Sequence, residues 1–181
     1  AVALGLGGPL SAAEAKRSFK IGVCDWMIGK GGTPDALKLA AELELDGIMA
    51  SFGAPTDKFD LRKPENRKLF ADATAAHGTV IASLGMGVLN GIPYKSDPRT
   101  EEWVSDSIDV SKQLGTNVVL LAFFSKGDLK NDKEGTEEVI RRFKRVAPKA
   151  EKEGVILGIE SWLSAEEHLY IIDKVGSPNI Q

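Results

Sequence analysis

The sequence is poor in the side chains that build thiol and histidine active sites. It contains one cysteine, Cys24, and two histidines, His77 and His168, in 181 residues. A single cysteine cannot form an intramolecular disulfide. Cys24 also lies in an apolar segment, where buried thiols are usually inert, so we expect no catalytic thiol.

Both histidines have an explanation that needs no ligand. His77 precedes Gly78 at the end of a predicted helix, where an imidazole faces the helix dipole and a glycine supplies the left-handed cap. His168 lies beside the apolar stripe of the last predicted helix, which favours a packed or boundary side chain.

Basic charge is not in excess either. The formal net charge is −3 and the sequence pI is about 5.5, which argues against nucleic-acid binding because that function needs a basic face. The one basic run, residues 141–145, has apolar neighbours at helical spacing and is interpreted as the solvated face of a helix. Hydrophobic residues make up 43% and charged residues 27%, as in a soluble globular domain, and no stretch is long and apolar enough to span a membrane.

The first 15 residues differ from the rest of the chain. They are small and apolar, carry no charge before Glu14, and end in Ala13-Glu14-Ala15, an A-x-A cleavage pattern. We interpret residues 1–15 as the tail of a secretory signal peptide and expect export to the periplasm. A disordered N-terminal tail on a cytoplasmic protein is the alternative. Residues 16–181 are then the folded part.

Short apolar runs alternate with amphipathic segments from Phe19 onward. The runs predict strands near residues 20–26, 47–52, 79–84, 116–123 and 155–160, with a sixth strand beginning at Asn179. Five helices are predicted after these strands, at about residues 34–44, 64–77, 101–114, 137–153 and 165–175. We expect Thr33 to cap the first helix and Thr136 the fourth, and we interpret residues 53–63 as a polar linker.

This alternation predicts an α/β fold with a parallel sheet. No G-x-G-x-x-G motif follows the first strand, so a dinucleotide-binding fold is unsupported. The unit size fits a TIM barrel, which needs about 250 residues when closed. The chain has 181 residues, so we expect an incomplete parallel (β/α) barrel of about five βα units, cut after roughly two-thirds of its length.

One carboxylate stands where barrel chemistry is usually found. The apolar run 155–159 ends in Glu160, and Ser164 with Glu167 forms a capping box that opens the next helix. Glu160 is thus expected at the carboxyl end of a buried strand, the edge at which parallel α/β folds bind ligands. A helix-capping role, or an ion pair with a lysine, is the alternative.

Four other residues are weaker candidates for contact with a substrate. Trp26 and Trp162 suit stacking on the C–H face of a sugar, although core packing explains an aromatic residue equally well. Asn90, in a glycine-rich loop, and Asp25 are possible pocket residues.

Four stretches resemble the sugar phosphate isomerase/epimerase family, the xylose isomerase-like TIM barrels. They are the opening strand at 21–26, the segment 40–48, the long loop after the third strand, and Gly158-Ile159-Glu160 with residues 164–167 and 175–180. The resemblance covers Phe19 to Gln181.

The resemblance implies a divalent metal ion, such as Mn, Mg, Co or Zn, with Glu160 as one ligand and as a proton shuttle. The other expected ligands, an Asp, a His and a Glu, lie beyond residue 181. The implied function is a metal-dependent isomerase or epimerase of a sugar or polyol, phosphorylated or not, acting by proton transfer next to a carbonyl. We expect the 181-residue piece alone to be inactive.

Two branches of the family fit poorly. Only residues 161–163 separate Glu160 from the helix cap, whereas the ketose 3-epimerase branch has a longer loop with a second Glu. The apurinic endonuclease branch needs histidines at early strand ends, and none occurs there. A dehydratase or lyase acting on a keto-sugar, and a non-catalytic carbohydrate-binding barrel, remain as alternatives. The expected partner is a small sugar or polyol. Whether the protein forms a homo-oligomer is left open.

Overall fold

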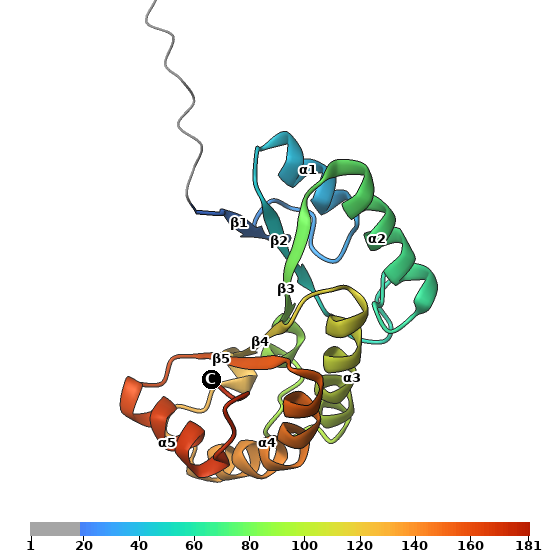
Figure 1. Ribbon diagram of the computed structural model, residues 1–181. Coiled ribbons are helices and arrows are strands. Elements are labelled where there is room, and N and C mark those ends of the chain that lie inside the picture. The colour runs from blue at the N-terminus through green and yellow to red at the C-terminus, as the bar shows by residue number, and fades with distance from the viewer. Residues whose placement is uncertain (1–18) are drawn as a thin grey trace, which may run out of the picture.

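The computed structural model describes residues 19–181, so the expected leader at residues 1–15 lies outside the described residues. Strands and helices alternate along the chain, with two short 3₁₀ helices in loops (Figure 1). The strands are β1 Gly22–Cys24, β2 Gly47–Ser51, β3 Val80–Met86, β4 Val118–Phe123 and β5 Ile156–Ser161. The helices are α1 Asp35–Glu42, α2 Pro64–His77, η1 Gly87–Asn90, α3 Arg99–Gln113, η2 Ser125–Gly127, α4 Lys133–Glu153 and α5 Ala165–Val175.

The sheet is parallel throughout, and its spatial order β1-β2-β3-β4-β5 follows the chain. A parallel bridge between Leu157 and Ile180 marks the start of the expected sixth strand. Figure 1 shows the sheet curving, with the helices following one another along its outer side. The predicted parallel α/β barrel architecture is confirmed over the described residues.

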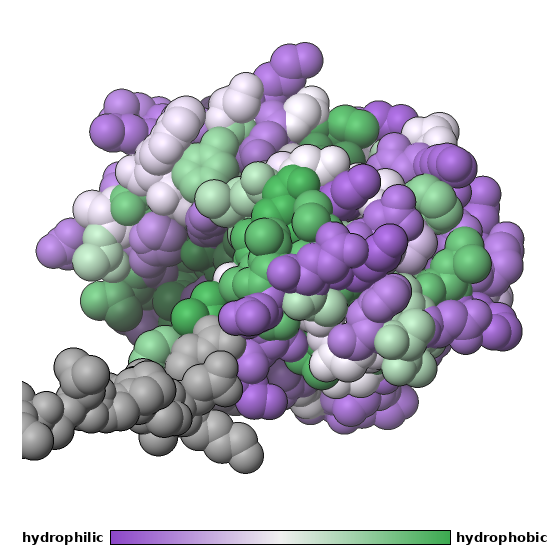
Figure 2. Space-filling model, turned by 90° about the horizontal axis from the view of Figure 1, so that it is seen from above, coloured by the Kyte–Doolittle hydropathy of each residue, from purple (hydrophilic) through white to green (hydrophobic). Residues whose placement is uncertain are grey.

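The core lies between the strands and the helices. Its largest aromatic group comprises Tyr94, Phe123 and Phe143, whose ring centroids lie 5.4 to 6.3 Å apart. Tyr94 is fully buried, and this burial raises the pKa of its hydroxyl well above the usual value. Apolar side chains also reach the surface: viewed from above, they gather around a hollow framed by hydrophilic residues (Figure 2).

The predicted helix ends are partly confirmed. Gly78, Gly154 and Gly176 cap α2, α4 and α5 in the left-handed conformation, with φ between 66° and 73°. These positions favour glycine because a Cβ is strained there. Ser164 and Glu167 make the expected capping box at α5.

Both threonine caps were predicted wrongly. The hydroxyl of Thr33 donates to the carbonyl of Lys30, and α1 begins at Asp35 without a side-chain cap. Helix α4 begins three residues before Thr136, because Asp132 accepts a hydrogen bond from the backbone of Gly135 and takes the cap position. Thr136 lies inside the helix.

The interval 53–63 contains no helix or strand, as expected of a linker, but it is packed against the rest of the fold. Arg62 places its guanidinium 4.2 Å from the ring centroid of Phe52 and 5.6 Å from that of Trp103. The same guanidinium pairs with Asp60 and Asp106. This arrangement anchors the segment between β2 and α2 to α3.

Helix α5 buries a different face from the one expected. The apolar residues of the predicted helix that share one face are Ala165, Leu169, Ile172 and Val175. In the structure Leu169 is 56% exposed, whereas Ile171 is fully buried. Among the described residues, α5 packs mainly against α4. No helix among residues 19–181 is long and apolar enough to cross a bilayer.

Candidate functional site

A cavity of about 660 Å³ opens at the carboxyl ends of the strands. Residues following each of the five strands, or ending them, line it, as expected where parallel strands present their ends at one edge. The wall is largely apolar and aromatic. Its main side chains are Trp26, Ser51, Phe52, Asp57, Met86, Val88, Asn90, Leu120, Phe124 and Glu160.

Glu160 lies on the cavity wall, near the end of β5. Its backbone pairs with Ala122 of β4, which fixes its position along the strand. The carboxylate is exposed and makes neither a hydrogen bond nor an ion pair with the described residues. A carboxylate in this state is available to a ligand.

The negative charge of Glu160 also affects the pKa of Cys24, the last residue of β1. Burial raises the pKa of the Cys24 thiol, and the charges of Asp25 and then Glu160 raise it further. The thiol therefore stays protonated near neutral pH. This agrees with the expectation that Cys24 is not a nucleophile.

Trp26 forms part of the cavity wall immediately after β1. Its side chain is 46% exposed, and its ring lies against Gly85 of β3. A Cβ at Gly85 would lie 3.0 Å from the Trp26 ring and 2.9 Å from the Met49 sulfur. Glycine at position 85 thus makes room for the indole.

Asn90 reaches the cavity from the end of η1. Its side-chain oxygen accepts a 2.8 Å hydrogen bond from the backbone of Phe124. This bond joins the loop after β3 to the loop after β4. The amide nitrogen of Asn90 makes no hydrogen bond with the described residues, so it can donate to a ligand in the cavity.

Asp25 and Trp162 do not line the cavity. Asp25 is fully buried, and its carboxylate accepts hydrogen bonds from the backbone of Gly32 and from both the backbone and the hydroxyl of Ser51. Trp162 is 59% exposed and packs against Phe124, with 5.2 Å between ring centroids. The structure therefore brings together Trp26, Asn90 and Glu160, and places the other two candidates beside them.

A family model described as xylose isomerase-like TIM barrel matches residues 37–181. The chain belongs to this family. The match includes four of the five strands of the sheet and the whole cavity wall except Trp26 and the glycine loop after it.

Relatives of this xylose isomerase-like barrel include named epimerases. The chain is 23% identical over 160 residues to 2-epi-5-epi-valiolone 7-phosphate 2-epimerase from Actinoplanes sp., covering 88% of this chain and 58% of that enzyme. The chain thus spans less than two-thirds of the length of this relative.

Solved structures share the fold at low sequence identity. A xylose isomerase-like TIM barrel protein from Mycobacterium smegmatis, in complex with magnesium, has a TM-score of 0.71 at 16% identity, covering 90% of this chain and 63% of that one. The 3-keto-D-glucoside 4-epimerase from E. coli has a TM-score of 0.68 at 10% identity, covering 90% and 66%. These likenesses establish the fold.

The donor set of this xylose isomerase-like barrel fits part of a metal site. Glu160 offers an uncommitted carboxylate, which hard divalent cations prefer. No group of three or more His, Cys, Asp or Glu side chains placed to hold a metal ion occurs among residues 19–181. The carboxylates on the wall of the cavity, Glu160 and Asp57, do not by themselves make such a group.

Asp57 is a cavity residue that the sequence analysis missed. It lies in the interval interpreted as a linker, and its carboxylate accepts a 2.9 Å hydrogen bond from the backbone of Ala54. A Cβ at Gly53 would overlap this carboxylate, so glycine at 53 permits the turn. The sequence signal for this turn was Gly53, directly after the predicted strand 47–52 and four residues before Asp57.

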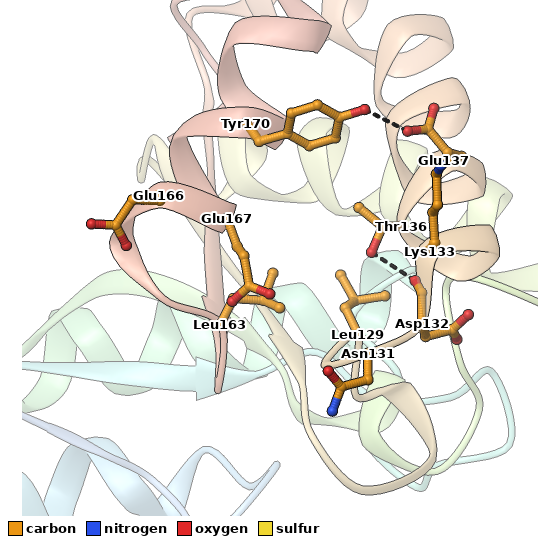
Figure 3. A pocket seen from close by; sticks show the side chains of 10 residues that line it. All are labelled: Leu129, Asn131, Asp132, Lys133, Thr136, Glu137, Leu163, Glu166, Glu167 and Tyr170. Carbon is orange, nitrogen blue, oxygen red and sulfur yellow. Dashed lines mark hydrogen bonds between the residues drawn. The ribbon is translucent and has the colours of Figure 1, made fainter.

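A second hollow of about 490 Å³ lies between the starts of α4 and α5 (Figure 3). The Tyr170 hydroxyl donates a 2.7 Å hydrogen bond to Glu137 across it, and this bond raises the pKa of Tyr170. The hydroxyl of Thr136 donates to the carbonyl of Asp132. These polar groups satisfy one another, so we assign no chemistry to this groove between helices.

Proposed function

We propose that the full-length protein is a metal-dependent isomerase or epimerase of a sugar or polyol, phosphorylated or not. The observation that carries the proposal is Glu160, an uncommitted carboxylate on the wall of a cavity at the carboxyl ends of parallel strands. Active sites of barrel enzymes lie at this face. Since Glu160 has no partner among the described residues, its charge has no evident structural use.

The relatives support this choice of reaction. The curated relative is named a 2-epimerase, and solved structures of the same fold include a 3-keto-D-glucoside 4-epimerase and a D-psicose 3-epimerase. One structural neighbour is described as a complex with magnesium. All three of these named enzymes are epimerases.

Three residues of the cavity wall have separate roles in the proposed reaction. Trp26 presents an aromatic face on which the apolar face of a sugar ring packs. The Asn90 amide donates a hydrogen bond to a substrate oxygen. Glu160 would be a ligand of a bound divalent cation and would accept or return the proton next to the carbonyl. When bound, the cation polarises the substrate oxygens and lowers the barrier to removal of that proton.

The test uses the full-length protein in D₂O with Mn²⁺ and a panel of ketoses, aldoses and their phosphates. An isomerase or epimerase incorporates deuterium at the carbon that loses its proton, which mass spectrometry and NMR detect. Glu160→Gln keeps the shape and removes the charge, so exchange should fall by at least about a hundredfold, the lower end for a general acid–base group. Exchange at the wild-type rate in this variant would remove Glu160 from the chemistry.

The same experiment separates the alternative reactions. A dehydratase would release a product lighter by one water molecule instead of an epimer. A carbohydrate-binding barrel would bind a sugar in calorimetry without any exchange. Either result would replace the proposed reaction while leaving the fold assignment intact.

We also propose export of the protein, from the Ala13-Glu14-Ala15 pattern. Protein purified from the periplasm of its native host should begin near Lys16, as read by N-terminal sequencing. Recovery of residues 1–15 on the exported protein, or of the protein in the cytoplasm alone, would contradict export.

A further inference from the structure

Behind Glu160, on the opposite face of β5, lies a chain of hydrogen bonds involving the next residue, Ser161. Successive side chains of a strand point to opposite faces, so Glu160 meets the cavity while Ser161 faces α5. The Ser161 hydroxyl lies 3.1 Å from Nε2 of His168 and accepts a 3.0 Å hydrogen bond from the backbone of Leu163. The other ring nitrogen, Nδ1 of His168, lies 3.0 Å from the backbone oxygen of Ser164.

The partners fix the direction of each hydrogen bond. The carbonyl of Ser164 can only accept, so Nδ1 of His168 carries the hydrogen in the neutral ring. Nε2 is then an acceptor, and the Ser161 hydroxyl donates to it. The hydroxyl oxygen keeps its lone pairs for the Leu163 N–H. A continuous set of hydrogen bonds therefore links residues 161–164 to His168 of α5.

We propose that Ser161 and His168 form a latch that positions Glu160 for metal and substrate. On one side Glu160 is held by β4, through the register with Ala122. On its other side, β5 pairs with the segment that follows α5, where the N–H of Ile159 donates to the carbonyl of Gln181. The turn 161–164 follows Glu160 directly, and the Ser161–His168 latch ties it to α5. This role rests on the proposed function of Glu160.

Both latch residues are positioning residues, because neither lines the cavity. Removing a group that orients a metal ligand typically weakens metal affinity by about 10- to 100-fold. A purely structural bond would instead lower thermal stability without changing affinity. The two roles are therefore separable by measurement.

The test measures Mn²⁺ affinity by calorimetry and the unfolding temperature of the metal-free, full-length protein. Ser161→Ala and His168→Leu break the latch and should weaken Mn²⁺ binding about 10- to 100-fold. His168→Gln retains an acceptor for the Ser161 hydroxyl and should restore most of the affinity. His77→Leu removes the other histidine, which is exposed at the end of α2, and should bind Mn²⁺ as the wild type does.

A second measurement needs no metal. Ser161→Ala deprives the Leu163 N–H of its acceptor, so hydrogen exchange of that amide should be at least about fivefold faster, the effect of losing a bond of roughly 1 kcal/mol. Unchanged exchange would mean that the latch does not hold the turn.

The outcomes separate the latch from the proposed function. If Glu160→Gln loses Mn²⁺ binding but the latch variants bind as the wild type, the latch proposal is overturned and the function stands. If Glu160→Gln binds Mn²⁺ like the wild type, the proposed metal ligand is wrong, and the positioning role falls with it. Loss of affinity in both latch variants, with recovery in His168→Gln, supports the proposal.

Discussion

Ser51 donates a 2.6 Å hydrogen bond from its hydroxyl to the buried carboxylate of Asp25, 26 positions earlier in the chain. The backbone N–H groups of Ser51 and Gly32 donate to the other oxygen of the same carboxylate. One side chain thus joins the ends of β1 and β2 to the glycine loop, beside Trp26. Asp25 therefore holds these three segments together next to the cavity wall.

Asp25→Ala should therefore act on stability first. Two backbone donors would lose their acceptor, and each unsatisfied buried group costs about 1–3 kcal/mol. We expect the free energy of unfolding to fall by about 3 kcal/mol, as measured by chemical denaturation. Ser51→Ala removes only one donor and should cost about 1 kcal/mol. The exposed Asp35, changed to Ala, is the matched control, and a loss as large there would refute this reading.

The close approach of Gly85 to Trp26 leads to a prediction about binding. In Gly85→Ala the new methyl group would meet the Trp26 ring and the Met49 sulfur at about 3 Å, so the indole must move. Overpacking of this kind costs roughly 1–3 kcal/mol. We expect a higher KM together with a lower unfolding temperature in the full-length protein.

Gly87 provides the control for that substitution. It also lines the cavity, but a Cβ there has nothing within 4 Å. Gly87→Ala should leave the unfolding temperature and KM close to those of the wild type. Equal effects at both positions would mean that the indole is not held against Gly85.

Several surface carboxylates have lowered pKa values, so we expect the fold to lose stability in acid. Arg99 donates hydrogen bonds to both carboxylate oxygens of Asp97, and these hold the pKa of Asp97 at about 2. Hydrogen bonds from Arg145 and Arg142 likewise lower the pKa values of Glu101 and Glu138. A carboxyl group whose pKa is lower in the folded than in the unfolded chain stabilises the fold above its unfolded pKa, about 4. That stabilisation disappears as the pH falls towards 2.

The unfolding temperature should therefore drop between about pH 4.5 and pH 2. Asp97→Asn cannot titrate at this position, so its unfolding temperature should fall less over the same interval. Because Asp97 and Arg99 are at the surface, 1 M salt should also reduce the slope. An Asp97→Asn profile parallel to that of the wild type would exclude a contribution from this pair.

The strands and their parallel order could be predicted because each depends on local pattern. Apolar runs bounded by glycines determine where strands and helices alternate, and a sheet built that way is parallel. The helix α4 start could not be predicted in the same way. Asp132 and Thr136 are both good caps, and Asp132 is favoured by a 2.7 Å bond to Lys95, 37 residues away. That contact exists only after folding.

The candidate site likewise combines features that the local sequence predicts with features that depend on the folded chain. Glu160 at the end of β5 follows from the sequence, because an apolar run stops there. Its sharing of one cavity with Trp26 and Asn90 depends on the curvature of the sheet. The path of the loop after β2, which brings Asp57 to the cavity, depends on the turn at Gly53 and has no periodic signal.

The last prediction concerns the two exposed tryptophans, which the sequence could not rank. Trp26 lines the cavity and Trp162 does not, although both side chains are about half exposed. Stacking on an aromatic face is worth about 0.5–1.5 kcal/mol, which corresponds to roughly 2- to 12-fold in affinity. Trp26→Ala should raise KM for the sugar by about that factor, and Trp26→Phe should recover part of it.

Trp162→Ala removes a side chain of the same size that packs against Phe124 but does not line the cavity, and should leave KM nearly unchanged. Steady-state kinetics of the three variants in the full-length protein, on whichever sugar exchanges deuterium, measure the difference. A rise in KM for Trp162→Ala as large as for Trp26→Ala would mean that the substrate extends over Phe124, past the cavity. The binding surface would then include the loop after β5, and the short segment between Glu160 and α5 would contact the substrate directly.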